Sequence, residues 1–127
     1  MKHLLVSIIA LLASTTVHAA NWTIDDTHAL NDTFKQVVGV QVAQDISINS
    51  MVAYHVGDTL TIQHSYQTDF ESLDRNVTHE NLLPVVDEFC GQGRNIMKSY
   101  RNLKQVQAVY EYHLNTGKYE KFSFTCR

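Results

Sequence analysis

The stretch that decides the fold is ISINSMVAYHVGDTLTIQHSY, residues 46–66. Apolar and polar residues alternate along it with a period of two, which is typical of half-buried β-strands. Gly57 and Asp58 interrupt the alternation, as a tight turn does. The stretch therefore predicts a β-hairpin. The residues that share the apolar parity on its two arms are Ile46, Ile48, Val52, Tyr54, Val56, Leu60, Ile62, His64 and Tyr66.

The length of the turn follows from that parity. Cross-strand partners face the same side of a sheet, so equal parity on both arms requires an odd number of loop residues. We expect a three-residue loop at residues 57–59, which pairs Val56 with Leu60 and Tyr54 with Ile62. A two-residue loop would instead set Tyr54 against a polar threonine.

The C-terminal segment repeats this pattern and predicts a second hairpin. Its expected turn is residues 115–117, with Gly117 at the left-handed position that a three-residue loop prefers. Tyr110 then faces Phe122, and Cys126 points to the buried side. The residues on the apolar parity are Val106, Ala108, Tyr110, Tyr112, Leu114, Phe122, Phe124 and Cys126.

A helical period precedes each hairpin. Residues 27–38 are predicted to form the first helix, although residues 40–42 beyond it could form a short strand. A second stripe of apolar residues at helical spacing begins after Asn81, which is the expected N-cap of the second helix. Gly91 and Gly93 are expected to end that helix before another helical segment begins. The apolar stripes are Leu30, Phe34, Val37 and Val38 in the first helix, Leu82, Leu83, Val86, Phe89 and Cys90 in the second, and Ile96, Met97, Tyr100 and Leu103 in the last segment.

These elements predict an α+β fold. We expect a four-stranded antiparallel sheet built from two hairpins, with helices on one face (α-ββ-α-ββ). Two separate hairpin layers would also fit the pattern. The chain shows no repeat or linker, so residues 20–127 are predicted to form a single domain.

Residues 1–19 have the pattern of a cleaved signal peptide. Lys2 and His3 precede an apolar run, and Val17 and Ala19 give a small-residue cleavage site. No later stretch approaches the ~20 apolar residues of a membrane span. The expected location is therefore the bacterial periplasm.

The charge balance bears on the class of partner. The full chain has 10 Lys+Arg and 13 Asp+Glu, and removal of Lys2 with the signal leaves 9 against 13, a formal net charge of −4. This acidity argues against a nucleic-acid partner and mildly favours a basic one.

Cys90 and Cys126 are the only cysteines of the chain. In an oxidising compartment a disulfide between them is expected, and closing that loop stabilises a fold by roughly 4 kcal/mol in the chain-entropy model. The spacing is not that of a metal site, because neither a CxxC motif nor a paired His/Cys motif is present.

Few residues have the arrangement of a catalytic or cofactor site. No histidine pair has metal-ligand spacing, and neither a GxSxG elbow nor a glycine-rich phosphate loop occurs. His64 lies on the inward parity, which favours a hydrogen-bonded core imidazole over a general base. The carboxylates of Asp69, Glu71 and Asp74 could serve a glycosidase only in a cleft, for which so small a domain leaves little room. We therefore expect no enzyme, no metal and no cofactor.

Residues 66–76 have the composition of a protein-binding face. Phe70 lies there among Asp69, Glu71 and Asp74, and aromatic side chains beside polar ones are common in interfaces. We expect Asp69, Phe70, Glu71 and Asp74 to bind the partner. A solvated acidic loop is the alternative interpretation. A homodimer through an exposed strand edge is also possible.

Residues 46–127 resemble a group of small periplasmic proteins in layout. The shared features are the strand motif LTIQHSY at residues 60–66, the helical Cys90, the tyrosine-rich strand YEY at residues 110–112, the turn glycine Gly117 and the terminal Cys126. Some members are similar to immunity proteins of type VI secretion, including one that acts against the lysozyme-like domain of a VgrG spike effector.

The resemblance implies a stoichiometric inhibitor, often dimeric, of a peptidoglycan-hydrolase effector toxin. It gives no inhibitory residues, because the group has no motif that assigns them. The alternatives are a periplasmic small-ligand-binding or envelope assembly module and, less favoured, a small hydrolase.

Overall fold

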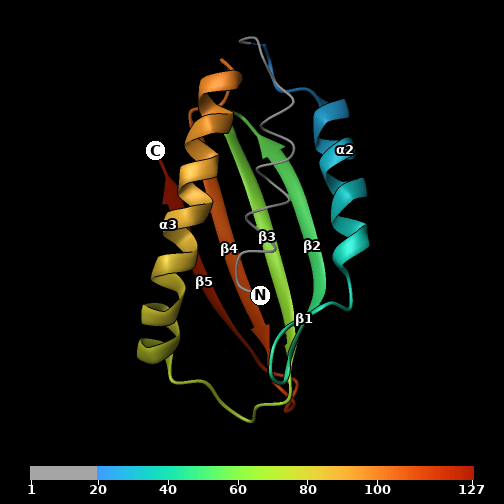
Figure 1. The fold of residues 1–127 in the computed structure, drawn as a ribbon, viewed down its shortest axis with the longest axis vertical. Helices are drawn as coiled ribbons and strands as arrows, with labels where there is room; N and C mark the ends of the chain where they lie inside the picture. The colour runs from blue at the N-terminus through green and yellow to red at the C-terminus, as the bar shows by residue number, and fades with distance from the viewer. Residues whose placement is uncertain (1–19) are drawn as a thin grey trace.

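The computed structural model describes residues 20–127, so the expected signal peptide at residues 1–19 lies outside the described residues. Figure 1 shows α2 (Ile24–Phe34) beside β2 (Ile46–Val56), and α3 (Arg75–Ser99) over β4 (Gln105–His113) and β5 (Tyr119–Cys126), in front of one twisted sheet. The elements in chain order are α2 (Ile24–Phe34), the 3₁₀ turn η1 (Lys35–Val37), β1 (Gln41–Ala43), β2 (Ile46–Val56), β3 (Thr59–Thr68), α3 (Arg75–Ser99), β4 (Gln105–His113) and β5 (Tyr119–Cys126).

The sheet has five strands in the order β1-β2-β3-β4-β5, and its central pair, β3 and β4, is parallel. The expectation of a four-stranded antiparallel sheet is therefore wrong. The 25 residues of α3 span about 37 Å, slightly more than the roughly 33 Å of the ten-residue β3. The helix thus returns the chain to the end where β3 began, and β4 must run alongside β3 in the same direction.

The fifth strand, β1, comes from the segment that the sequence left open between helix and strand. It pairs antiparallel with β2 through a tight turn in which Asp45 has a φ of 62°. Asp45 is the only non-glycine among residues 20–127 with positive φ, a conformation that Asp tolerates better than most residues.

The turn of the first hairpin differs from the expectation. Val56 pairs with Thr59, so the loop is the two residues Gly57 and Asp58. Gly57 has a φ of 62°, as the first position of a type II′ turn requires. The parity argument fails because a β-bulge between Ile48 and Ser50 inserts one extra residue into β2.

The bulge reverses which side chains of β2 face the helices. Ala53 is buried and pairs with Ile62, whereas Val52, Tyr54 and Val56 are exposed on the opposite face of the sheet. The second hairpin follows the prediction: Tyr110 pairs with Phe122, and Leu114 and Lys118 close the turn around residues 115–117.

The helices also begin and end at other residues than expected. Thr23 caps α2 in a capping box with Asp26, and Asp74, not Asn81, caps α3. α3 continues through Gly91 and Gly93. A Cβ on Gly93 would lie 3.3 Å from the Cβ of Val106, so this glycine lets the helix approach β4 closely.

The predicted disulfide is confirmed. Cys90 of α3 and Cys126 of β5 are bonded, with 5.2 Å between their Cα atoms. The bond fixes the middle of α3 over the edge of the sheet. Within residues 20–127, no helix is both long and apolar enough to span a membrane.

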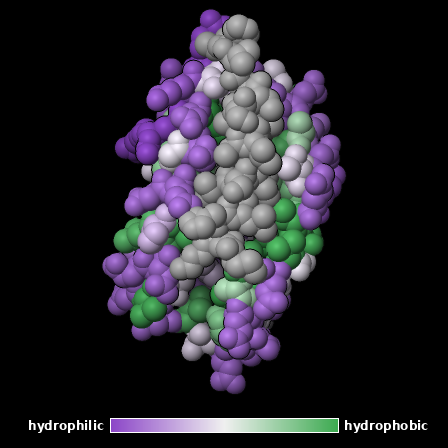
Figure 2. Space-filling view, viewed as in Figure 1, coloured by the Kyte–Doolittle hydropathy of each residue, from purple (hydrophilic) through white to green (hydrophobic). Residues whose placement is uncertain are grey.

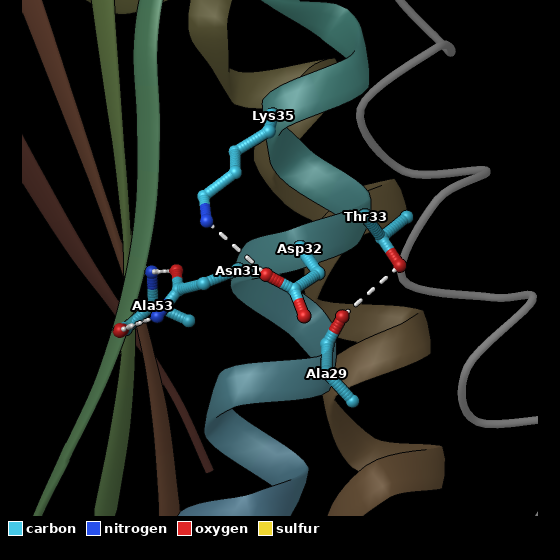
Figure 3. A network of polar contacts seen from close by, with 6 residues as sticks. All are labelled: Ala29, Asn31, Asp32, Thr33, Lys35 and Ala53. Atoms are coloured by element: carbon cyan, nitrogen blue, oxygen red, sulfur yellow. Dashed lines mark hydrogen bonds and ion pairs between the residues drawn. The ribbon is translucent and has the colours of Figure 1, made fainter.

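The free edge of β2 is covered by a side chain. The Asn31 amide oxygen of α2 accepts from the Ala53 N–H at 2.6 Å, and its Nδ2 donates to the Ala53 carbonyl at 2.9 Å. Figure 3 shows this side chain reaching from the helix to the strand, while Asp32 and Lys35 pair on the helix surface. Asn31 thus supplies the two hydrogen bonds that a neighbouring strand would otherwise supply.

Substitution of Asn31 by Ala should therefore weaken the fold and open the edge. We expect the free energy of unfolding to fall by about 1–2 kcal/mol, because two backbone groups lose their partners. Chemical denaturation measures the loss, and sedimentation velocity reports any new association. Thr33→Ala is the matched control, because its hydroxyl bonds only within α2.

Substitution of Gly93 by Val should destabilise the protein by about 1–3 kcal/mol, because the added atoms meet Val106. Gly91→Val is the control, since a Cβ there has open space around it. Thermal and urea unfolding of both variants compare the two positions. Equal stability of the two variants would contradict the close helix–strand contact.

Candidate functional site

The predicted binding residues lie in the segment that joins β3 to α3, residues 69–74, which we call the acidic loop. Backbone hydrogen bonds hold its first residues at both sides. The Asp69 N–H donates to the Asp45 carbonyl at 3.2 Å, and the Asn115 N–H donates to the Phe70 carbonyl at 2.9 Å. The start of the loop is therefore tied to the β1–β2 turn and to the β4–β5 turn.

The four predicted residues have different surroundings. Asp69 and Glu71 are exposed, and neither carboxylate has an ion-pair partner within residues 20–127. Phe70 is half-buried. The Asp74 carboxylate accepts from the N–H groups of Asn76 and Val77, at 3.0 and 3.2 Å, and so caps α3. Two of the three acidic side chains are thus free to meet a partner.

An apolar pocket of about 540 Å³ opens beside the acidic loop. It lies between the first half of α3 and the adjoining ends of β1, β2, β3 and β4. Figure 2 shows hydrophobic residues along the lower part of α3 on this side of the molecule. The lining residues are Val42, Ala43, Ile46, Tyr66, Phe70, Ser72, Leu73, Asp74, Val77, Thr78, Asn81, Leu82, Val85 and Tyr112.

Burial of the lining residues separates the floor of the pocket from its mouth. Tyr66 and Leu82 are buried and form the floor, whereas Ser72, Asp74 and Val77 are exposed at the mouth. The volume lies within the ~300–1,000 Å³ of small-molecule sites, which also combine apolar walls with a few polar groups. The pocket has the dimensions of a binding site.

Two tyrosines supply polar groups to the apolar wall. The Tyr66 and Tyr112 rings lie 5.1 Å apart, and neither hydroxyl has a hydrogen-bond partner among the described residues. Burial raises the pKa of Tyr112 to about 12 and the pKa of Tyr66 well above its usual value. Both hydroxyls are therefore neutral near pH 7 and can donate or accept a hydrogen bond.

Arg75 lies next to the acidic loop but is bound to β5. Its guanidinium pairs with Glu120 at 2.6 Å, donates to the Lys121 carbonyl at 3.1 Å, and lies 4.4 Å from the centre of the Phe122 ring. These contacts hold the first turn of α3 on the sheet. They also commit the positive charge of Arg75 to Glu120 instead of to Asp69 or Glu71.

His64 occupies the core, as its parity predicted. It is 1% exposed, its Nδ1–H donates to the Val109 carbonyl at 3.0 Å, and its ring stacks on Tyr110 at 4.5 Å between centroids. Burial lowers its pKa from 6.5 to about 4, although the hydrogen bond to Val109 opposes the shift. Nε2 has no partner among the described residues. His64 is therefore a neutral core side chain near pH 7.

The sequence predicted the acidic loop as a binding surface, which stays a prediction, and did not predict the pocket beside it. The part of α3 that lines the pocket was not predicted to be helical, because the helix was expected to begin after Asn81. The signal was available: Asp74 is a good N-cap, and Val85, Leu82 and Thr78 lie at helical spacing on the way back toward it. Within residues 20–127, no three His, Cys, Asp or Glu side chains cluster closely enough to hold a metal.

Comparison of the chain with protein-family models, with curated proteins and with solved structures found no match. The geometry and chemistry of the chain itself therefore carry the functional argument.

The buried histidine makes stability depend on pH. Below pH 6.5 the unfolded chain binds a proton at His64, whereas the folded protein does so only near pH 4. Folding stability should therefore fall by about 3 kcal/mol as the pH drops from 6.5 to 4. Urea unfolding at several pH values measures this slope. The slope should be smaller in His64→Gln than in the control His28→Gln, whose side chain is exposed.

Proposed function

We propose that the protein is a periplasmic immunity protein that binds a muramidase-like peptidoglycan-hydrolase effector and blocks its cleft. The observation that carries the proposal is the acidic loop: Asp69 and Glu71 are exposed without an ion-pair partner among the described residues, and the same loop lines an apolar pocket through Phe70, Leu73 and Asp74. Charged groups at a rim and an apolar anchor site at the centre are the usual arrangement of a protein-binding surface.

Charge supports a basic partner. A net charge of −3 for the full chain, with Asp69 and Glu71 exposed on one loop, favours encounter with a cationic surface. Wall hydrolases are typically basic. Carboxylates placed in such a cleft would meet cationic groups and exclude the substrate.

The anchored start of the loop supports tight binding. Its hydrogen bonds to Asp45 and Asn115 fix the backbone of Asp69 and Phe70 before a partner arrives. A segment that is already ordered loses less conformational entropy on association. The disulfide is also consistent with export to an oxidising compartment.

A small-ligand-binding module is the second candidate function. The pocket favours it, because about 540 Å³ of largely apolar space has the size of a small-molecule site and does not require a protein partner. Such a module would bind its ligand and give no protection against a hydrolase.

The inhibitor proposal is tested with the hydrolase encoded beside this gene, if the adjacent gene encodes a toxin or spike protein. The two proteins should co-purify, and the inhibitor should suppress peptidoglycan digestion at a 1:1 ratio. Digestion of peptidoglycan by the isolated protein, or the absence of both binding and protection, would refute the proposal.

The double substitution Asp69→Asn with Glu71→Gln should weaken that complex about tenfold in calorimetry, with a larger effect at low salt. Asp74 is left intact because it caps α3. The control is Asp25→Asn with Asp58→Asn, which removes the same charge from exposed positions outside the loop. Equal affinity of the two double variants would contradict the placement of the interface.

A further inference from the structure

We propose that the apolar pocket under α3 binds a neutral or cationic amphiphile, with the apolar part of the ligand on the buried floor and its head group toward the mouth, where Asp74 and the half-buried Tyr112 line the pocket. This inference does not rest on the inhibitor function, because the isolated protein should bind such a molecule by itself.

The walls determine the apolar part of the ligand. Leu82 lies at the floor, and Phe70, Leu73 and Val85 are half-buried around it. Water in such a space has few polar partners, so its replacement by hydrocarbon is favourable. A single chain or a compact ring system fits the volume better than a polar metabolite does.

Tyr112 is the tyrosine that can bond to the head group of the ligand, because it is half-buried, whereas Tyr66 belongs to the buried floor. Both residues line the pocket, and neither hydroxyl has a hydrogen-bond partner among the described residues. Because Tyr112 stays neutral, it can bond to a hydroxyl, an amide or an amine without a counter-ion. An alkane without such a group would leave it unpaired.

The mouth determines the charge of the ligand. Asp74 lines it, and Asp69 and Glu71 belong to the same loop, whereas no Lys or Arg is among the lining residues. Arg75, which follows Asp74 in the chain, is paired with Glu120. An anionic head group, such as the carboxylate of a fatty acid, would therefore meet repulsion, while an ammonium group would be attracted.

The pocket is built from elements that are fixed without a ligand. The loop start is bonded to two turns, Asp74 caps α3, and the disulfide holds the helix on the sheet. Such a site loses little entropy on binding.

The test uses N-phenyl-1-naphthylamine, an uncharged apolar fluorophore, with the purified protein. We expect saturable binding at one site. Dodecylamine, dodecanol and dodecanoate are then compared as competitors of the probe, each below its micellar concentration. The three have the same chain length, so differences in displacement report the effect of the head-group charge. The amine and the alcohol should displace the probe at concentrations at least tenfold lower than the carboxylate does.

Val77→Asp should weaken probe binding at least tenfold, because it places a charge at the mouth. Val77 is 55% exposed, so the substitution spares the core, and Val56→Asp at a 70% exposed position outside the pocket is the matched control. Tyr112→Phe should weaken dodecanol more than the probe, with Tyr119→Phe as its control.

Three results would overturn the inference: no saturable binding, equal loss in Val77→Asp and Val56→Asp, or displacement by dodecanoate as effective as that by dodecylamine. Circular dichroism of each variant verifies the fold. Ligand binding without protection against a hydrolase would refute the inhibitor function alone, and protection without ligand binding would refute this inference alone.

Discussion

The parallel pairing of β3 with β4 is the constraint on which the rest of the structure depends. It exists because α3 returns the chain along the full length of the sheet, and the bond between Cys90 and Cys126 holds the helix in that position. Gly93 allows the close approach that the bond needs. With α3 fixed there, its first three turns extend beyond the disulfide and form one wall of the pocket.

The acidic loop and the pocket are two parts of one surface. Phe70 and Leu73 belong to the loop and also line the pocket, where both are half-buried. A movement of the loop would therefore change the shape of the pocket. Occupation of the pocket, by a ligand or by a side chain of a partner, would contact the loop directly. The same geometry therefore accommodates both proposed roles.

Local patterns predicted the parts of the fold that depend on neighbouring residues. The register of the β4–β5 hairpin, the buried His64 and the pairing of the cysteines follow from alternation and composition. The turn of the first hairpin could not be predicted in this way, because the bulge near Asn49 changes parity without any proline or glycine to mark it. The strand order is a long-range property, since it depends on how far α3 extends. Its true start was concealed by the assumption that Pro84 lies in the first turn, whereas the helix accommodates it in its interior. The same error concealed the pocket.

The two hydrogen bonds between the Asn31 side chain and the Ala53 backbone have a consequence for the choice of expression host. Residues 31–33 read Asn-Asp-Thr, an N-glycosylation triplet, and the acceptor atom of that reaction is the same Nδ2 that donates to the Ala53 carbonyl. A sugar attached before folding would crowd the strand edge and displace the amide from it. In protein secreted from a eukaryotic cell, the free edge of β2 at Ala53 would then lack the Asn31 hydrogen bonds that protein made in bacteria has, although the polypeptide is identical.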